Sequence, residues 1–303
     1  MFTMFISVFN NKISSHIIKL LSSSTIIVTF GILLGSFFSY LLQFFLGRSL
    51  SIGDYGTFNA LLSLTYLVGV PAGVFGTSIV KMSSELLAKE RWDKIVTLYW
   101  RLNLYFLYFG VLMFAILLFN KTRVANYLNI DNISVILPFS IYLGMSYLSI
   151  VPNAYLQGLL RFKAFAFMTS FGSFLRMLFP VIFVLVGFKV YGVFYGFSIA
   201  ILCSFLISYL LLKKNLVISE GLDEYHLISN YKKILTFSSS VLFINFGLMA
   251  LNNMDMIMVK RFFDPETAGY YAGTVTLGKI FLFGAGTIST VMFPQIANLY
   301  SKN

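Results

Sequence analysis

Eight long apolar runs, separated by short charged connectors, dominate the pattern of hydrophobic and polar positions along the chain. The runs extend over Leu20 to Gly47, Tyr55 to Val80, Leu102 to Asn120, Asn132 to Leu160, Ala164 to Phe188, Val190 to Leu212, Ile234 to Val259 and Thr267 to Ser301. A hydrocarbon core about 30 Å thick is crossed by roughly 20 helical residues, and each run reaches about that length. Barrel strands would be about half as long and would alternate in polarity. The pattern therefore predicts an all-α polytopic membrane protein with eight transmembrane helices.

The composition agrees with this class and excludes several others. Hydrophobic residues make up 58% of the chain and charged residues only 11%, which excludes a soluble domain of 303 residues. The lone Cys203 lies within an apolar run, and His16 and His226 lie in polar flanks of the runs, so we expect no disulfide framework and no metal site. The chain has no Gly-rich loop that would bind a nucleotide phosphate, and we expect no cofactor.

The net charge of +11 is better explained by membrane topology than by nucleic-acid binding. Lys and Arg favour the cytoplasmic ends of membrane spans. With the amino terminus in the cytoplasm, thirteen Lys and Arg fall on the cytoplasmic side. Six fall on the opposite side, namely Arg48, Lys121, Arg123, Lys189, Lys260 and Arg261. We therefore expect both termini in the cytoplasm, with larger inward loops at Lys81 to Lys94 and Lys213 to Lys233. Residues 1–19 mix apolar and polar positions as an interfacial amphipathic segment does, and they show no signal-peptide cleavage pattern.

Two segments of the chain resemble each other. Arg48 to Gly56 follows the first run and Arg261 to Gly269 follows the seventh, with the same spacing from Arg to Gly. Continuing the same offset aligns Leu64 with Leu277. Because the offset spans six helices, an even number, the predicted repeat is parallel. The domains expected are a first six-helix lobe over 20–214, a cytoplasmic linker over 215–233, and the first two helices of an incomplete second lobe over 234–303.

Several motifs together resemble the polysaccharide-biosynthesis (lipid-linked oligosaccharide) flippases. The motifs are Gly47 to Gly56, Tyr155 to Lys163, Asn253 to Asp255, Asp264 to Tyr271 and Phe293 to Ile296. This family belongs to the superfamily that includes the multidrug and toxin extrusion exporters. The resemblance implies two lobes of helices around a central cavity, in twelve or more spans. The chain ends after the eighth run, so we expect it to be truncated relative to that family.

Charged residues inside apolar runs are the candidates for chemistry, because a cation at the membrane centre costs about 3 kcal/mol or more. Arg176 lies about 18 Å into its helix, counted from Ala164 at 1.5 Å per residue. It is a candidate to face a cavity and bind phosphate bidentately, or else to bond helix carbonyls at the helix breaks expected at Pro152 or Pro180. Arg101 is a weaker cavity candidate, since it can extend to the cytoplasmic interface.

The incomplete second lobe adds two charges. Lys279 lies about 15 Å from Gly269 and is a candidate second cation for an anionic substrate. Asp255 is a candidate for ion coupling, or for a salt bridge with basic residues near it in sequence. Pro71, with Gly69, Gly73 and Gly76, is a candidate hinge in the second span. The patterns Gly31-x-x-x-Gly35 and Gly192-x-x-x-Gly196 predict close helix packing.

The resemblance implies that the protein flips a polyprenyl-pyrophosphate-linked oligosaccharide across the bilayer of a bacterial cytoplasmic membrane by alternating access, for synthesis of a surface polysaccharide of the O-antigen or capsule type. The expected partners are this lipid-linked glycan and the bilayer, with a glycan polymerase or other assembly proteins as further candidates, and no nucleic acid. A cation-coupled drug exporter is an alternative, although the first lobe lacks an embedded carboxylate. A membrane-bound glycan polymerase or ligase would be an enzyme, but the external loops are too short for its acid–base groups. A non-transporting fragment is the last alternative.

Overall fold

A computed structural model describes the backbone of residues 12–213 and 231–279, with the side chains of all of these except 12–25 and 231–241. Within this part every element is a helix. The elements are α2 (Lys12–Ser49), α3 (Ile52–Ala88), α4 (Trp92–Phe119), α5 (Lys121–Tyr127), η1 (Ile133–Val135), α6 (Ile136–Ser146), η2 (Tyr147–Ser149), α7 (Ile150–Gly158), α8 (Phe162–Leu185), α9 (Lys189–Leu212), α10 (Tyr231–Phe262) and a further helix over 265–279. Most of the predicted interfacial segment, most of the linker, and the eighth run beyond residue 279 lie outside the described residues.

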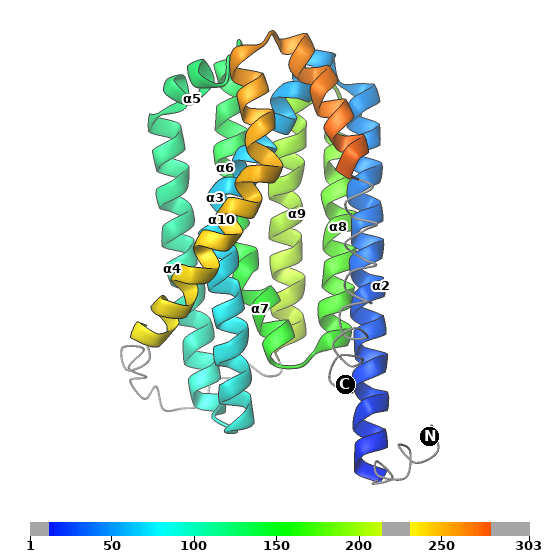
Figure 1. Cartoon of the computed structure of the whole chain (residues 1–303), viewed down its shortest axis with the longest axis vertical. Coiled ribbons are helices and arrows are strands. Elements are labelled where there is room, and N and C mark those ends of the chain that lie inside the picture. The colour runs from blue at the N-terminus through cyan, green and yellow to red at the C-terminus, as the bar shows by residue number, and fades with distance from the viewer. Residues whose placement is uncertain (1–11, 214–230, 280–303) are drawn as a thin grey trace, which may run out of the picture.

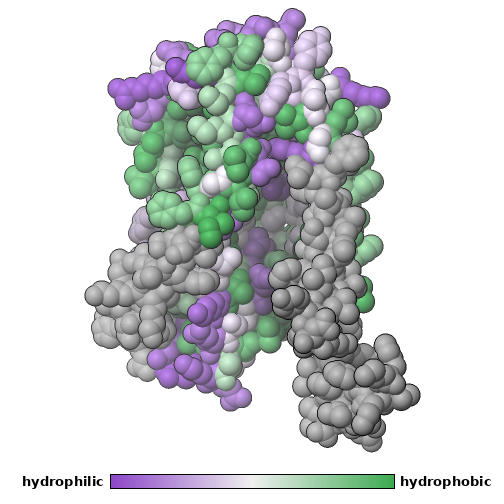
Figure 2. Space-filling model, in the orientation of Figure 1, coloured by the Kyte–Doolittle hydropathy of each residue, from purple (hydrophilic) through white to green (hydrophobic). Residues whose placement is uncertain are grey.

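Seven helical segments in the described part are long and apolar enough to cross a membrane. Figure 1 shows them running alternately up and down, with the connections at 50–51, 120–132, 186–188 and 263–264 at the upper end. Figure 2 shows hydrophobic side chains over the middle of the molecule and hydrophilic ones towards both ends. The helix over 265–279 is the start of the predicted eighth span. The prediction of an all-α polytopic membrane protein is confirmed.

Glycines bring α2, α8 and α9 into close contact, as the small-residue patterns predicted. A Cβ on Gly31 would lie 2.8 Å from the carbonyl oxygen of Ala166 in α8. Gly196 of α9 likewise packs against Pro180 of α8. In addition, the Ser170 hydroxyl donates to the carbonyl of Gly31 across the α2–α8 interface at 3.0 Å. Lipid tails are as apolar as the helix surfaces, so the hydrophobic effect does not drive helices together in a membrane. Close packing at small residues and hydrogen bonds between helices stabilise their association instead.

At the lower end the structure corrects the predicted loop at Lys81 to Lys94. Helix α3 continues to Ala88 and α4 begins at Trp92, so that only residues 89–91 form the turn. Both helices extend here because their apolar residues, among them Leu86 of α3 and Leu98 of α4, are buried in a shared hydrophobic cluster that stabilises the helices at this end. The Tyr155 hydroxyl of α7 donates to the carbonyl of Ile95 within the same cluster, at 3.1 Å.

The fourth span is interrupted, whereas two other proline-containing spans are continuous. Between α6 and α7 the chain tightens into the 3-10 turn η2, just before Pro152. Pro152 has no N–H to continue the α-helical bonding, which favours the tighter turn before it. Helices α3 and α8 run through Pro71 and Pro180 as single helices. Pro71 therefore does not break its helix, and its role as a hinge remains a prediction.

The two repeated segments form equivalent helix starts at the upper end. Ser51 caps α3 by accepting a hydrogen bond from the Asp54 amide at 3.2 Å. Asp264, at the matching position of the repeat, caps the helix over 265–279 by accepting from the Thr267 amide at 2.9 Å. Small polar side chains at this position satisfy backbone donors that have no partner within the helix. The sequence repeat is thus also a structural repeat over these residues.

Candidate functional site

A cavity of about 580 Å³ lies in the middle of the molecule, between α2, α3, α8 and the helix over 265–279. Phe197 of α9 and Met256 of α10 complete its wall. Figure 2 shows the molecule hollowed in this region, with hydrophilic residues visible inside. A largely apolar cavity that also carries several polar side chains is typical of a site that holds a ligand.

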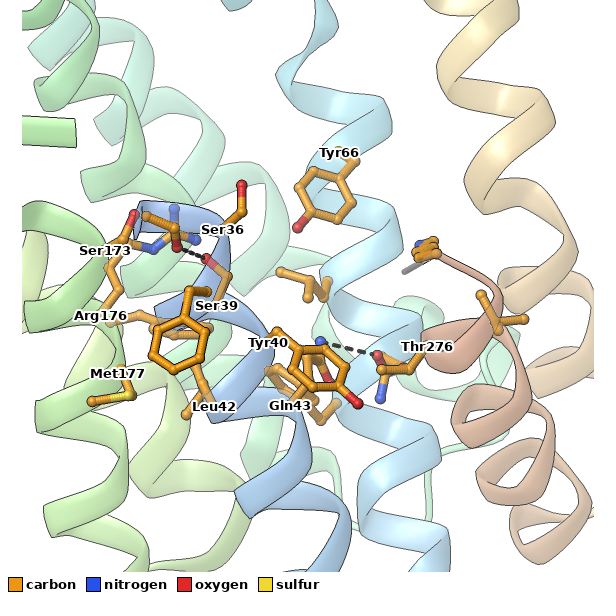
Figure 3. A pocket seen from close by; sticks show the side chains of 18 of the residues that line it. Ser36, Ser39, Tyr40, Leu42, Gln43, Tyr66, Ser173, Arg176, Met177 and Thr276 are labelled. Atoms are coloured by element: carbon orange, nitrogen blue, oxygen red, sulfur yellow. Dashed lines mark hydrogen bonds between the residues drawn. The ribbon is translucent and has the colours of Figure 1, made fainter. Parts of the chain in front are cut away.

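The polar residues of the cavity form one stripe on each of four helices. The stripes are Ser36, Ser39, Tyr40 and Gln43 on α2; Asn59, Ser63 and Tyr66 on α3; Thr169, Ser173 and Arg176 on α8; and Thr276 and Lys279 on the helix over 265–279. Apart from the adjacent Ser39 and Tyr40, successive residues of a stripe are three or four positions apart, which places the side chains on one helix face. In Figure 3 the α2 stripe lies between Arg176 and Ser173 on one side and Tyr66 and Thr276 on the other. Four helices therefore turn their polar faces towards the same space.

Arg176 lines the cavity, where its side chain is exposed. One guanidinium N–H donates to the hydroxyl of Tyr142 at 3.3 Å, and the guanidinium carbon lies 5.2 Å from the centre of the Phe197 ring. Among the bonds of the described residues, none joins Arg176 to a helix carbonyl near a proline. The side chain is positioned by a hydroxyl and an aromatic face, and neither neutralises its charge.

Lys279 also lines the cavity, from the helix over 265–279. This helix and α10 form the second repeat unit, which matches α2 and α3 of the first. The ammonium group of Lys279 lies 3.5 Å from the side-chain oxygen of Asn253, a buried residue of α10. Asp255, two residues further along α10, accepts a hydrogen bond from the Tyr271 hydroxyl at 2.8 Å and is not among the lining residues. In the described part of the chain no ion pair involves Asp255.

Two cations and no carboxylate are found among the described residues that line the cavity. A guanidinium and an ammonium group in a space of low dielectric attract phosphate-like anions and repel cations. Hydroxyl and amide groups supply the remaining polar surface. The cavity is therefore suited to a ligand that carries negative charge and many hydrogen-bonding groups.

The upper end of the cavity is closed by a network of neutral polar side chains. The Tyr55 hydroxyl donates to the side-chain oxygen of Gln43 at 3.0 Å and lies 3.1 Å from the Thr276 hydroxyl oxygen. The side-chain nitrogen of Gln43 donates to Asn59 at 3.5 Å, and Asn59 in turn donates to the carbonyl of Tyr55 at 3.0 Å. The network joins α2 and α3 of the first lobe to the helix over 265–279.

The repeat extends to the cavity wall. The offset that relates Arg48 to Arg261 also relates the α3 residues of the wall to residues of the helix over 265–279. The matched pairs, all lining the cavity, are Asn59 with Ala272, Leu62 with Val275, Ser63 with Thr276 and Tyr66 with Lys279. In the preceding helices, the same offset relates Gln43 of α2 to Met256 of α10, and both also line the cavity. A parallel repeat places equivalent faces on either side of a shared site. The cavity lies between the two repeat units.

The remaining candidates lie elsewhere. Arg101 is half-buried in α4 and is not among the residues that line the cavity, and neither is Pro71 in α3. The structure therefore brings together Arg176 and Lys279 of the charged candidates. The sequence reasoning missed Gln43, Asn59 and Tyr66. Their helical spacing along each apolar run was the signal that could have identified them.

Comparisons with known proteins identify the fold and the family. A MOP superfamily transporter from Pyrococcus furiosus, described as having a binding pocket of reversed polarity, is similar in structure. The TM-score is 0.60, with 14% sequence identity over 92% of this chain and 74% of that protein. No curated protein sequence matched the chain. The polysaccharide biosynthesis protein family matches residues 45–302, which include both repeated segments and the helices of the cavity wall other than α2, and the chain therefore belongs to this family.

Proposed function

We propose that the protein moves a polyprenyl-pyrophosphate-linked oligosaccharide across the cytoplasmic membrane of a bacterium, for the synthesis of a surface polysaccharide. The upper end of the molecule would face the outside, and both termini would lie in the cytoplasm. A glycan polymerase or another assembly protein would take up the product.

One observation carries this proposal, namely that the cavity combines two cations with a neutral hydroxyl and amide lining. Pyrophosphate is an anion that Arg176 can bind through two parallel N–H groups, while Lys279 adds a second positive charge. Sugar hydroxyls exchange hydrogen bonds with Ser, Thr, Tyr, Asn and Gln side chains. Family membership supports a role in polysaccharide biosynthesis.

Export of cationic drugs is less well supported. Such a substrate would be repelled by Arg176 and Lys279, and a carboxylate facing the cavity would be expected to bind it. Asp255 instead bonds Tyr271 outside the described lining.

The test is the Arg176→Ala substitution in a strain whose surface polysaccharide depends on this protein. We expect export to fall about tenfold or more, because hydrogen bonds to charged groups contribute about 1.5–3 kcal/mol. The readouts are surface polysaccharide and the lipid-linked glycan retained in the inner leaflet. Arg176→Lys should retain part of the activity, since it keeps the charge but loses the bidentate geometry.

Arg101→Ala is the matched control, because it removes the same side chain from a span that does not contribute to the cavity wall. It should leave export near the wild-type level at equal protein abundance. Undiminished export in the Arg176→Ala strain would contradict the proposed role of the cavity.

A further inference from the structure

The lining of the cavity has a charged group and a neutral polar group of side chains. Arg176 and Lys279 supply the charge, whereas Gln43, Asn59 and Thr276 are all neutral. Along the helix over 265–279, Thr276 and Lys279 are three residues apart, which is about 4.5 Å at a rise of 1.5 Å per residue. A single ligand with an anionic part and a neutral polar part could therefore contact both regions at once.

The amide groups at the upper end retain hydrogen-bonding capacity. Within the described part of the chain, Gln43 and Asn59 each use one N–H of the side-chain amide. The bond between them, at 3.5 Å, is at the outer limit of hydrogen-bonding distance. Both side chains are half-buried and line the cavity, so that their remaining N–H groups are available to a ligand. Amides offer donors and acceptors together, as sugar hydroxyls do.

The repeat indicates that packing does not require these amides. Met256 and Ala272 occupy the positions that match Gln43 and Asn59, in the same wall of the same cavity. At these two positions the second repeat unit thus has apolar side chains, although Thr276 and Lys279 of the same unit are polar. Burying an amide in a membrane span is costly unless its polar groups are satisfied, so its presence in the first unit alone points to a ligand.

We infer that Gln43, Asn59 and Thr276 form a binding subsite for the sugar of the lipid-linked substrate, separate from the cationic subsite at Arg176 and Lys279. This inference rests on the proposed function. When the sugar binds, its hydroxyls form hydrogen bonds with Gln43 and Asn59 in place of the long hydrogen bond between these two side chains. The hydroxyl oxygens also accept hydrogen bonds from the remaining amide N–H groups. The lipid pyrophosphate remains with the cations, so the two subsites recognise different parts of one molecule.

The experiment measures binding of three probes to the full chain in lipid nanodiscs by native mass spectrometry. The probes are undecaprenyl pyrophosphate, the same lipid bearing one N-acetylglucosamine, and the same lipid bearing one galactose. For the wild type we expect at least one sugar to tighten binding, by about tenfold. In the Gln43→Met/Asn59→Leu double variant we expect this gain to disappear while binding of undecaprenyl pyrophosphate is retained. Retained binding of the bare lipid also shows that the variant is folded.

Two matched controls separate the subsite from a general loss of polar groups. Asn103→Leu removes an amide from α4 that donates to the carbonyl four residues earlier, as Asn59 does in α3, but lies outside the cavity lining. It should preserve the gain from the sugar. Arg176→Gln should weaken binding of all three probes by a similar factor.

The outcomes distinguish this inference from the function on which it rests. If the wild type binds the bare lipid but gains nothing from either sugar, the subsite is refuted and the anionic lipid remains the ligand. An equal loss for all probes in the double variant would also refute the subsite. If the wild type binds none of the probes, the proposed function fails, and the subsite fails with it.

Discussion

Arg176 is oriented for binding by neighbours that do not satisfy its charge. The Tyr142 hydroxyl accepts one of its N–H groups, and the Phe197 ring lies beneath the guanidinium. Among the described residues no other acceptor is bonded to this side chain, so that most of its N–H donors remain for a ligand, in a fixed plane. Holding the group in place before binding reduces the entropy that binding must overcome.

Asp264 is a single residue whose protonation should affect local stability. Its hydrogen bonds with the side chain and then the backbone of Thr267 lower the pKa of this exposed carboxyl below its usual value. Because the folded-state pKa is lowered, the stabilisation is present above a pH of about 4 and is lost as the pH falls through the folded-state pKa. We expect the start of the helix over 265–279 to open more readily in acid. Hydrogen exchange of a peptide covering residues 264–271 measures this opening.

Asp264→Asn provides the control for this prediction, since asparagine caps helices but does not titrate. Exchange in the wild type and in the variant should be compared at the same pH, so that the intrinsic exchange rate cancels. We expect the wild type to lose protection relative to the variant as the pH is lowered. A ratio that is independent of pH would contradict the role of the carboxylate.

The charged residues of the site could be predicted from the sequence, because each interrupts an apolar run. The neutral polar residues of the site could not be distinguished in this way from polar residues elsewhere in the helices. Arg176 and Lys279 are conspicuous because charge inside an apolar run is costly. A hydroxyl is less informative, because it can bond its own helix. Ser39 lines the cavity and bonds the carbonyl of Gly35, yet buried Thr65 makes the same type of bond outside the lining. Only the combination of stripes from several helices separates the two cases, and that requires the packing of the helices.

At the scale of helices, apolar runs predicted the spans but not where the helices end. The hydrocarbon thickness sets a minimum length, and α3 exceeds it with 37 residues. Its extension beyond the span is stabilised by burial against α4 at the lower end. Of the helix breaks predicted at Pro152 and Pro180, the first is present as a 3-10 turn and the second is wrong, since α8 continues through Pro180 as α3 does through Pro71. Local packing decides whether a proline interrupts a helix.

The contact between the starts of α3 and the helix over 265–279 depends on two glycines at matching positions of the repeat. A Cβ on Gly56 would lie 2.8 Å from the backbone nitrogen of Gly269, and a Cβ on Gly269 would collide with the carbonyl oxygen of Ile52. Gly269→Ala should therefore push the two helices apart and destabilise the fold by about 1–3 kcal/mol. Thermal unfolding in detergent measures this change.

Gly273→Ala is the comparison, because it lies one turn further along the same helix and a Cβ there would meet no atom of the described residues within 4 Å. We expect it to be neutral or slightly stabilising, since alanine favours helix more than glycine does. Equal destabilisation by both substitutions would indicate a helix effect rather than the loss of this contact.

In the whole molecule the two repeat units are in contact at the upper end. Figure 1 shows α10 and the helix over 265–279 leaving their shared turn at this end in different directions, with α10 crossing towards α4. Besides the glycine contact, the guanidinium carbon of Arg261 in α10 lies 4.2 Å from the centre of the Tyr127 ring in α5. Lys260 is only 1% exposed, and the carboxylates of Asp54, Asp131 and Asp264 attract its charge. The repeat in the sequence indicated two related units, but their contact could be read only from the fold.

Locking this upper contact should stop transport if the two units separate during the cycle. A Cβ on Gly53 would lie 3.1 Å from the Cβ of Pro265, close to the separation that a disulfide spans. In a Cys203→Ala background, Gly53→Cys/Pro265→Cys should form a disulfide on oxidation, visible by intact mass and by mobility on a denaturing gel. Export of surface polysaccharide should cease on oxidation and return on reduction.

The pair Gly69→Cys/Gly273→Cys lies on the same two helices without such a contact and should neither cross-link nor lose export. Failure to cross-link in a folded variant would contradict the observed contact, and undiminished export by the cross-linked protein would show that the upper end stays closed throughout transport.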